Sequence, residues 1–180
     1  MVIELYTDGS NYKGTGGYGW VLLRRNVPPF TGNAPTHHNF VEGDEIIAEG
    51  SGGFTTGATN NSMELAGIHH GLTYIKTRGY EEPVVVWTDS SYARHAITNW
   101  AIKWKHTGWK TSLGKPVANQ KRIEYILMRL RQIRKAGCQI KIRNLKGHLY
   151  YWNEYADQLA GDARKQSISD AQGIDHAHNA

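Results

Sequence analysis

The stretch Pro83-Val84-Val85-Val86-Trp87-Thr88-Asp89 decides the fold class of this chain. Its continuous apolar run suits a β-strand that is covered on both faces, and proline can open such a strand without interrupting its ladder. Strands of this kind occur in sheets that have helices on both sides. The run ends at an acid, Asp89, between two hydroxyl residues. The stretch therefore predicts an α/β domain with a polar group at a strand end.

Hydrophobic spacing on either side of this stretch predicts the other elements. Strand patterns occur at residues 2–7, 18–23, 45–54 and 140–145. Apolar residues at helical spacing occur at residues 61–77, 123–133 and 153–165. Three strands followed by helices that alternate with two more strands predict a five-stranded mixed sheet. We expect three antiparallel strands, then two parallel ones, with helices on both faces.

Length and composition predict one domain. The chain has 180 residues, of which 39% are hydrophobic, enough to bury a core. We expect the domain to cover residues 1–166 and residues 167–180, which are polar, to be a flexible tail. No basic leader and no long apolar run is present, so we expect no membrane span and a cytoplasmic location. The single cysteine, Cys138, excludes an internal disulfide and is expected to be buried.

Positive charge is concentrated in the middle of the chain. Residues 1–89 carry five Lys/Arg and ten Asp/Glu, whereas residues 90–123 carry seven Lys/Arg and no acid. Residues 124–152 add seven bases and one acid. Such asymmetry within one domain indicates an anionic partner, and nucleic acid is the commonest large one. The alternative at this point is a solvated basic face.

Four acids stand near predicted strand ends or helix starts: Asp8, Glu64, Asp89 and Asp157. Each also has a simpler explanation. Asp8 could belong to a turn that ends the first strand, Glu64 could form a capping box with Asn61, Asp89 could cap the next helix, and Asp157 could be an exposed acid. The predicted topology nevertheless allows all four to meet at one edge of the sheet. Clustered carboxylates of this kind form divalent-metal sites.

Six segments in order carry a resemblance to a known family. They are Thr7-Asp8-Gly9-Ser10, Gly16-Gly17-Tyr18-Gly19, Thr59-Asn60-Asn61-Ser62-Met63-Glu64-Leu65, Thr88-Asp89-Ser90-Ser91-Tyr92, Lys146-Gly147-His148 and Asn153-Glu154-Tyr155-Ala156-Asp157-Gln158-Leu159-Ala160. Together they resemble the motifs of type 1 ribonuclease H in its bacterial form, over residues 2–166. The resemblance implies the ribonuclease H-like fold. It also implies an endonuclease that cuts the RNA strand of RNA/DNA hybrids and leaves 3′-hydroxyl and 5′-phosphate ends.

The resemblance also implies a two-metal site. Four carboxylates can neutralise two Mg²⁺ ions about 4 Å apart, and Mn²⁺ has similar ligand preferences. By analogy with the family, Asp8 would bridge both ions, Asp157 would complete the water-activating site, and Glu64 with Asp89 would hold the second ion. His148 matches the histidine that assists proton transfer or product departure. Its alternative is an exposed loop histidine.

Two further sets of residues match substrate-binding positions of the family. Asn60, Asn61, Ser91 and Asn153 match positions that touch the hybrid, and neutral amides suit the sensing of 2′-hydroxyls. Thr59 matches a position that helps to hold a DNA-strand phosphate. The family's basic protrusion corresponds to Trp100, Lys103, Trp104, Lys105, Trp109 and Lys110. Trp100 and Trp104, four residues apart, could instead pack a helix, which leaves Trp109 as the better surface candidate.

Three departures from the family limit the comparison. The link after Asp8 is short, so no asparagine there is matched to the phosphate pocket. Residues 149–152 read Leu-Tyr-Tyr-Trp, which we expect to be a shorter, aromatic loop where relatives have a glycine-containing one. Residues 26–43 form a long excursion in which His37-His38 could bind a metal but is expected to be a polar surface pair. The rival classes are another nuclease of the same broad fold, a non-catalytic hybrid-binding module and a Ca²⁺-buffering protein. We expect a monomer.

Overall fold

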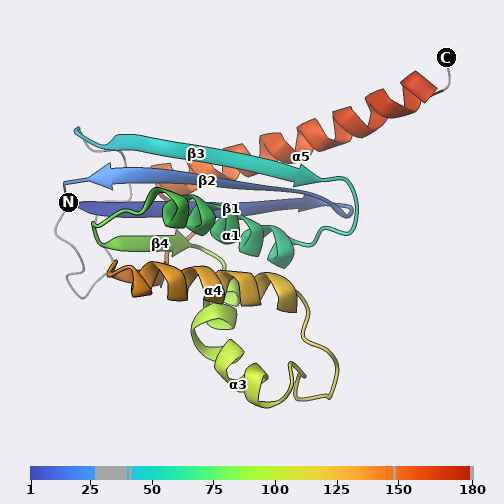
Figure 1. The fold of residues 1–180 in the computed structure, drawn as a ribbon. Helices are drawn as coiled ribbons and strands as arrows, with labels where there is room; N and C mark the ends of the chain where they lie inside the picture. The colour runs from blue at the N-terminus through green and yellow to red at the C-terminus, as the bar shows by residue number, and fades with distance from the viewer. Residues whose placement is uncertain (27–39, 41, 148, 179–180) are drawn as a thin grey trace.

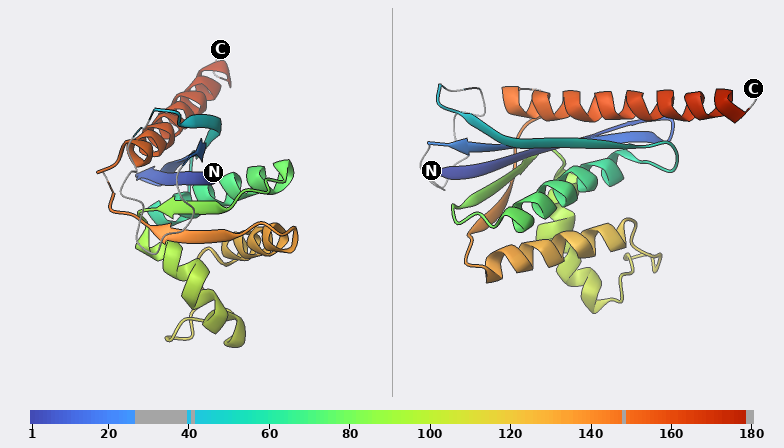
Figure 2. Two further views of the ribbon diagram at one scale, coloured as in Figure 1. Left: turned by 90° about the vertical axis from the view of Figure 1, so that its left-hand side faces the viewer. Right: turned by 45° about the horizontal axis from the view of Figure 1, so that its top comes forward.

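A five-stranded sheet lies between one long helix on one face and two helices on the other (Figures 1 and 2). The computed structural model describes residues 1–26, 40, 42–147 and 149–178. His37, His38 and His148 lie outside these residues. The strands are β1 Val2–Tyr12, β2 Thr15–Arg25, β3 Glu45–Phe54, β4 Val84–Thr88 and β5 Ile140–Asn144. The helices are α1 Asn60–Arg78, α2 Ser91–His95, the π-helix η1 Ala96–Trp100, α3 Ala101–His106, α4 Gln120–Lys135 and α5 Tyr151–His178.

The predicted sheet is confirmed. Its strand order is β3-β2-β1-β4-β5, with antiparallel pairs among the first three strands and parallel pairs from β1 to β4 and from β4 to β5. The five residues of β4 are all buried, as the apolar run at 84–88 predicts for a central strand. None of the described helices is both long enough and apolar enough to cross a membrane.

Strand β1 is longer than its apolar run indicates. It does not end at Asp8-Gly9 but continues to Tyr12, because β2 pairs with it along its whole length. Lys13 and Gly14 make the turn, with φ of 50° and 83°, the left-handed conformation of a two-residue hairpin. The segment expected to link the first two strands, between residues 7 and 18, is therefore mostly strand. Asp8 lies in the middle of a paired strand.

Alternation along β1 divides the core into two parts. Ile3 and Leu5 face α1 and α4, whereas Val2 and Tyr6 face α5. By the same period of two, Asp8 faces the side of α5 and Gly9 the side of α1. The site described below uses both sides.

Helix α5 packs against glycines of β2 and β3. A Cβ atom at Gly17 would collide with the carbonyl oxygen of Ala160, and one at Gly53 would collide with Ser167. The expected end of this helix at Lys165 is wrong, because contact with β3 continues through Ser167 and the helix runs to His178. The boundary at residue 166 and the flexibility of residues 167–180 stay predictions.

Candidate active site

Asp8 and Asp89 are brought together by the parallel pairing of β1 and β4. Tyr6 is in register with Trp87, so two residues further along Asp8 and Asp89 lie side by side at the end of β4. Neighbouring strands are about 4.8 Å apart, which is short enough for two carboxylates to share one ligand. Ser90, not Asp89, caps α2, because its side chain accepts from the backbone N–H of Ala93. The alternative role of Asp89 as a helix cap is therefore wrong.

Glu64 reaches the same place from helix α1. The helix begins after Thr59, whose side chain accepts from the N–H of Ser62, and the Ser62 hydroxyl accepts from the N–H of Thr59. The proposed capping box of Asn61 and Glu64 is therefore wrong, since a threonine two residues earlier starts the helix. Gly9 lets α1 approach, because a Cβ atom there would collide with the backbone of Glu64.

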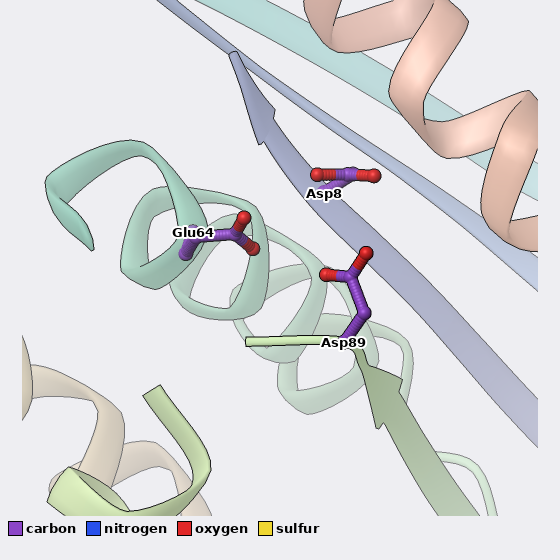
Figure 3. Close-up of side chains that lie close together, drawn as sticks. All are labelled: Asp8, Glu64 and Asp89. Atoms are coloured by element: carbon purple, nitrogen blue, oxygen red, sulfur yellow. The ribbon is translucent and has the colours of Figure 1, made fainter. Parts of the chain in front are cut away.

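Three carboxylates converge on one point. One oxygen from each of Asp8, Glu64 and Asp89 lies within 4.8 Å of the other two, and Figure 3 shows the three groups turned toward one another. Asp8 and Glu64 are each only 4% exposed. Asp157 comes from α5 and is not part of this tight group, but it lines the same cavity of about 430 Å³. The structure thus places all four predicted acids at one cavity.

Burial and mutual repulsion raise the pKa values of Asp8 and Glu64. Desolvation, followed by the charges of Asp89 and Asp157, raises the pKa of Asp8 to about 7, against a stabilising hydrogen bond of 2.6 Å from the backbone N–H of Gly9. Desolvation and the charges of Asp8 and Asp89 raise the pKa of Glu64 well above its ordinary value. Without a cation, the protein must hold like charges together in a place with little water.

The site fits a divalent cation. Oε2 of Glu64 is buried and has no hydrogen-bond partner among the described residues. A bound cation would satisfy this orphaned oxygen and remove the repulsion that raises the two pKa values. Hard carboxylate oxygens without histidine or cysteine in the described cluster suit Mg²⁺ or Mn²⁺.

An amide ties α5 to the acids. Nδ2 of Asn153 donates to Oδ2 of Asp8 at 3.1 Å, and the residue is 2% exposed. Its Oδ1 is buried without a partner among the described residues. The neighbouring Trp152 is also buried, and its Nε1 donates to Oδ2 of Asp44 at 3.2 Å. The end of the aromatic segment is therefore the first turn of α5, not a loop as expected.

The other predicted substrate residues lie around the same region. Thr59 caps α1, Asn60 lines the acidic cavity, and Asn61 is exposed in the first turn of α1. Ser91 is the exposed first residue of α2. Gly147 contacts the carboxylate of Asp89, since a Cβ atom there would collide with Oδ2. Gly147 therefore lies beside the acids, while His148 is outside the described residues.

Sequence reasoning missed several lining residues, namely Ser10, Asn11 and Ser90. Nδ2 of Asn11 donates to the carbonyl oxygens of Ala58 at 2.8 Å and Thr15 at 3.2 Å. It thereby ties the β1–β2 hairpin to the residue before Thr59. The polar residues Ser10 and Asn11 directly after Asp8-Gly9 are a signal for them, but Asp8-Gly9 also has the composition of a turn.

The three tryptophans of the basic protrusion differ in exposure, and not in the order expected from the sequence. Trp104 and Trp109 pack against the core, whereas Trp100 is 40% exposed and stacks on His95. Trp109 has φ 59° and its N–H donates to the carbonyl oxygen of Trp104 at 2.6 Å, so the chain turns back and its ring is partly buried against the core. The ranking of Trp109 as the surface candidate is wrong. The lysines at 103, 105 and 110 are all exposed.

Comparison with known proteins agrees with this arrangement. The family model for RNase H matches residues 1–165. Ribonuclease H of Treponema pallidum is 33% identical over 172 residues, which cover 92% of each chain. Ribonuclease H of Aeromonas salmonicida is 39% identical over 164 residues, 89% of this chain and 88% of the relative.

A solved structure shows the same fold. The foamy viral protease-reverse transcriptase in complex with RNA/DNA hybrid matches with a TM-score of 0.69 and 18% identity, over 90% of this chain and 20% of that longer one. The family model and the curated relatives cover nearly all of the chain, and the acids lie together as the motifs require. The chain belongs to the ribonuclease H family.

Proposed function

We propose that this protein hydrolyses the RNA strand of RNA/DNA hybrids with two bound Mg²⁺ ions, which Mn²⁺ can replace, and leaves 3′-hydroxyl and 5′-phosphate ends. The observation that carries the proposal is the buried group of Asp8, Glu64 and Asp89, with Asp157 at the same cavity, in a member of this family. Four acids gathered beside a basic surface suit a metal-dependent reaction on a polyanion.

The four acids would divide the task of holding the ions. Asp8 belongs to the close group with Glu64 and Asp89 and lines the same cavity as Asp157, so it would take part in holding both ions. Two such ions, when bound, activate the attacking water and stabilise the leaving 3′-oxygen of an in-line displacement. Asn153 holds Oδ2 of Asp8 in place through its amide. His148, which follows Gly147 in the sequence, would move a proton or help the product leave.

Selection for RNA would come from neutral groups near the acids. Asn60 lines the cavity, and Asn61, Ser91 and Asn153 flank it from three helices. Asn153, whose amide donates to Asp8, places a neutral amide beside the acids, the kind of group that suits the sensing of a 2′-hydroxyl. Thr59 would contact a phosphate of the DNA strand.

The basic protrusion would bind the DNA strand. The exposed lysines at 103, 105 and 110 carry its charge, and Trp100 offers an exposed ring. A cavity of about 360 Å³ is lined by Trp100, Trp104, Lys103 and Lys110, among others. Replacing all three lysines by alanine should weaken hybrid binding and flatten its dependence on salt.

We further propose that the protein acts as a monomer in the cytoplasm.

Cleavage assays test the proposal against its rivals. A labelled RNA/DNA hybrid should be cut in Mg²⁺ and spared in EDTA, whereas duplex RNA, duplex DNA and single strands should be spared in both. Equal cutting of DNA would favour another nuclease of the same broad fold. Binding without cutting would favour a non-catalytic module. Asp8→Asn should lower activity at least a thousandfold, which is about 4 kcal/mol of transition-state stabilisation.

A further inference from the structure

The β1–β2 hairpin carries a row of side chains out of the acidic cavity. Strand β1 extends well beyond the short β4, as Figure 1 shows. Because side chains alternate along a strand, Asp8, Ser10 and Tyr12 share the face that α5 covers. Asp8 and Ser10 line the cavity, and Tyr12 lies roughly 13 Å along the strand from Asp8. A strand of nucleic acid that leaves the cavity along β1 would reach Tyr12.

Arg164 of α5 contacts two side chains of this row, Ser10 and Tyr12. Nε of Arg164 donates to the hydroxyl of Ser10 at 3.0 Å, and its Cζ lies 5.8 Å from the centroid of the Tyr12 ring. Nζ of Lys13 lies 5.2 Å from the same centroid. Among the ion pairs of the described residues, none involves Lys13 or Arg164. Two cations without a compensating acid therefore flank one aromatic ring.

The ring itself is open to solvent. Tyr12 is 56% exposed, although it belongs to a paired strand. A single exposed tyrosine at a hairpin is ordinary. An exposed ring between two cations, linked through Ser10 to an acidic cavity, is the composition of a surface that stacks a base or sugar and neutralises a phosphate.

We propose that Tyr12, Lys13 and Arg164 form a second contact site for the scissile strand of the hybrid, beyond the acidic cavity. The proposal rests on the function proposed above. Tyr12 stacks on a sugar or base of that strand, while Lys13 and Arg164 neutralise a phosphate beside it. The site would fix how much duplex is needed on one side of the cleaved bond.

Two substitutions at Tyr12 test the ring. Tyr12→Thr removes the aromatic face and keeps a residue suited to a strand, whereas Tyr12→Phe keeps the face. Tyr12→Thr should raise KM for a long hybrid about fivefold or more, the lower end of what losing one base–aromatic stack costs, with a smaller change in kcat. Tyr12→Phe should restore KM. Hybrids shortened from either end should locate the contact, because the loss disappears once the duplex no longer reaches Tyr12.

Charge variants and a matched control complete the test. Lys13→Asn suits the left-handed turn, and Arg164→Gln keeps a donor for Ser10. Each should raise KM and flatten its salt dependence. Lys165→Ala, next on α5 and 69% exposed at its side chain, removes the same charge on another face and should leave KM unchanged.

The outcomes separate this proposal from the proposed function. If the Tyr12, Lys13 and Arg164 variants behave like Lys165→Ala while the hybrid is cut normally, the second contact site is wrong and the activity stands. If the unmodified protein cuts no hybrid, the proposed function fails. Binding of a fluorescent hybrid in EDTA then still tests the site, since Tyr12→Thr should weaken binding and unchanged binding would refute it.

Discussion

Asn153 and Asp8 lie 145 residues apart in the chain and share a buried hydrogen bond of 3.1 Å. The amide comes from the first turn of α5, whereas the carboxylate comes from the middle of β1. The bond therefore sets where the last helix stands relative to the acids. It also fixes one oxygen of the carboxylate that would serve both metal ions.

Loss of this amide should weaken metal binding. Asn153→Ala removes the donor to Asp8, and groups that hold metal ligands in place typically contribute 10- to 100-fold in metal affinity or activity. We expect the Mg²⁺ concentration for half-maximal cleavage to rise by about tenfold or more. A Mg²⁺ titration of initial rates measures this. Gln132→Ala, an amide of α4 on the opposite side of the sheet, is the control, and an equal effect there would contradict the role of Asn153.

Without metal, the acids should make stability fall as pH rises. The pKa of Asp8 is raised from 3.8 to about 7 by folding, so the folded state holds its proton more tightly than the unfolded state. The stabilisation is complete below pH 4 and is lost as pH rises to about 7. Asp8→Asn should therefore raise the melting temperature at pH 8 in EDTA by at least 2–4 °C, the shift for about 1 kcal/mol.

Mg²⁺ should reverse this trend in the unmodified protein. A cation binds the deprotonated acids, so its stabilising effect should grow between pH 5 and pH 8. Thermal unfolding at several pH values with Mg²⁺ and with EDTA measures both effects. A metal-free protein that gains stability over this range relative to Asp8→Asn would contradict the raised pKa.

Two adjacent arginines of β2 should differ greatly in their effect on stability. Arg25 is fully buried, with Nη1 at 2.9 Å from Glu4 and Nε at 2.8 Å from Asp44. Arg25→Met would leave Glu4 buried without its cation and should lower the free energy of unfolding by about 3–5 kcal/mol. Arg24 forms its ion pairs near the surface, and Arg24→Met should cost at most about 1 kcal/mol. Urea unfolding of both variants compares them, and equal costs would contradict the prediction.

Glycine 17 should be required for docking α5. A Cβ atom there would collide with the carbonyl oxygen of Ala160, and helix or strand backbone must move to accept it. Gly17→Ala should cost about 1–3 kcal/mol, as overpacking does. Gly161→Ala, one residue along the same helix from Ala160, meets open space and should be neutral or stabilising by up to about 1 kcal/mol. Chemical unfolding measures both, and a harmless Gly17→Ala would show that α5 can shift.

Most of the architecture could be predicted from local patterns. The apolar run at 84–88 is a fully buried central strand, and the expected third strand has the bounds Glu45–Phe54 that the pattern indicates. The helix predicted to end at residue 77 ends at Arg78, and Gly79 caps it with φ 70°. These features depend on neighbours in the chain, which the sequence shows directly.

Errors arose where a distant segment decides a local outcome. Asp8-Gly9 has the composition of a turn, but pairing with β2 continues the strand to Tyr12. The packing of the Trp109 ring against the core depends on the chain turning back onto α3, and the length of α5 depends on contact with β3. Hydrophobic spacing carries no information on such contacts.

The sequence by itself determined which residues can do the chemistry: the order of six motifs, four acids and a basic middle segment. The tertiary structure alone decided how close these groups come. Parallel pairing places Asp89 beside Asp8, and the missing side chain of Gly9 lets α1 bring Glu64 to them. Burial and the short distances between the carboxylates then raise the pKa of Asp8, and a bound cation would relieve the repulsion. Electrostatic energy depends on separation in space, and separation along the chain does not fix it.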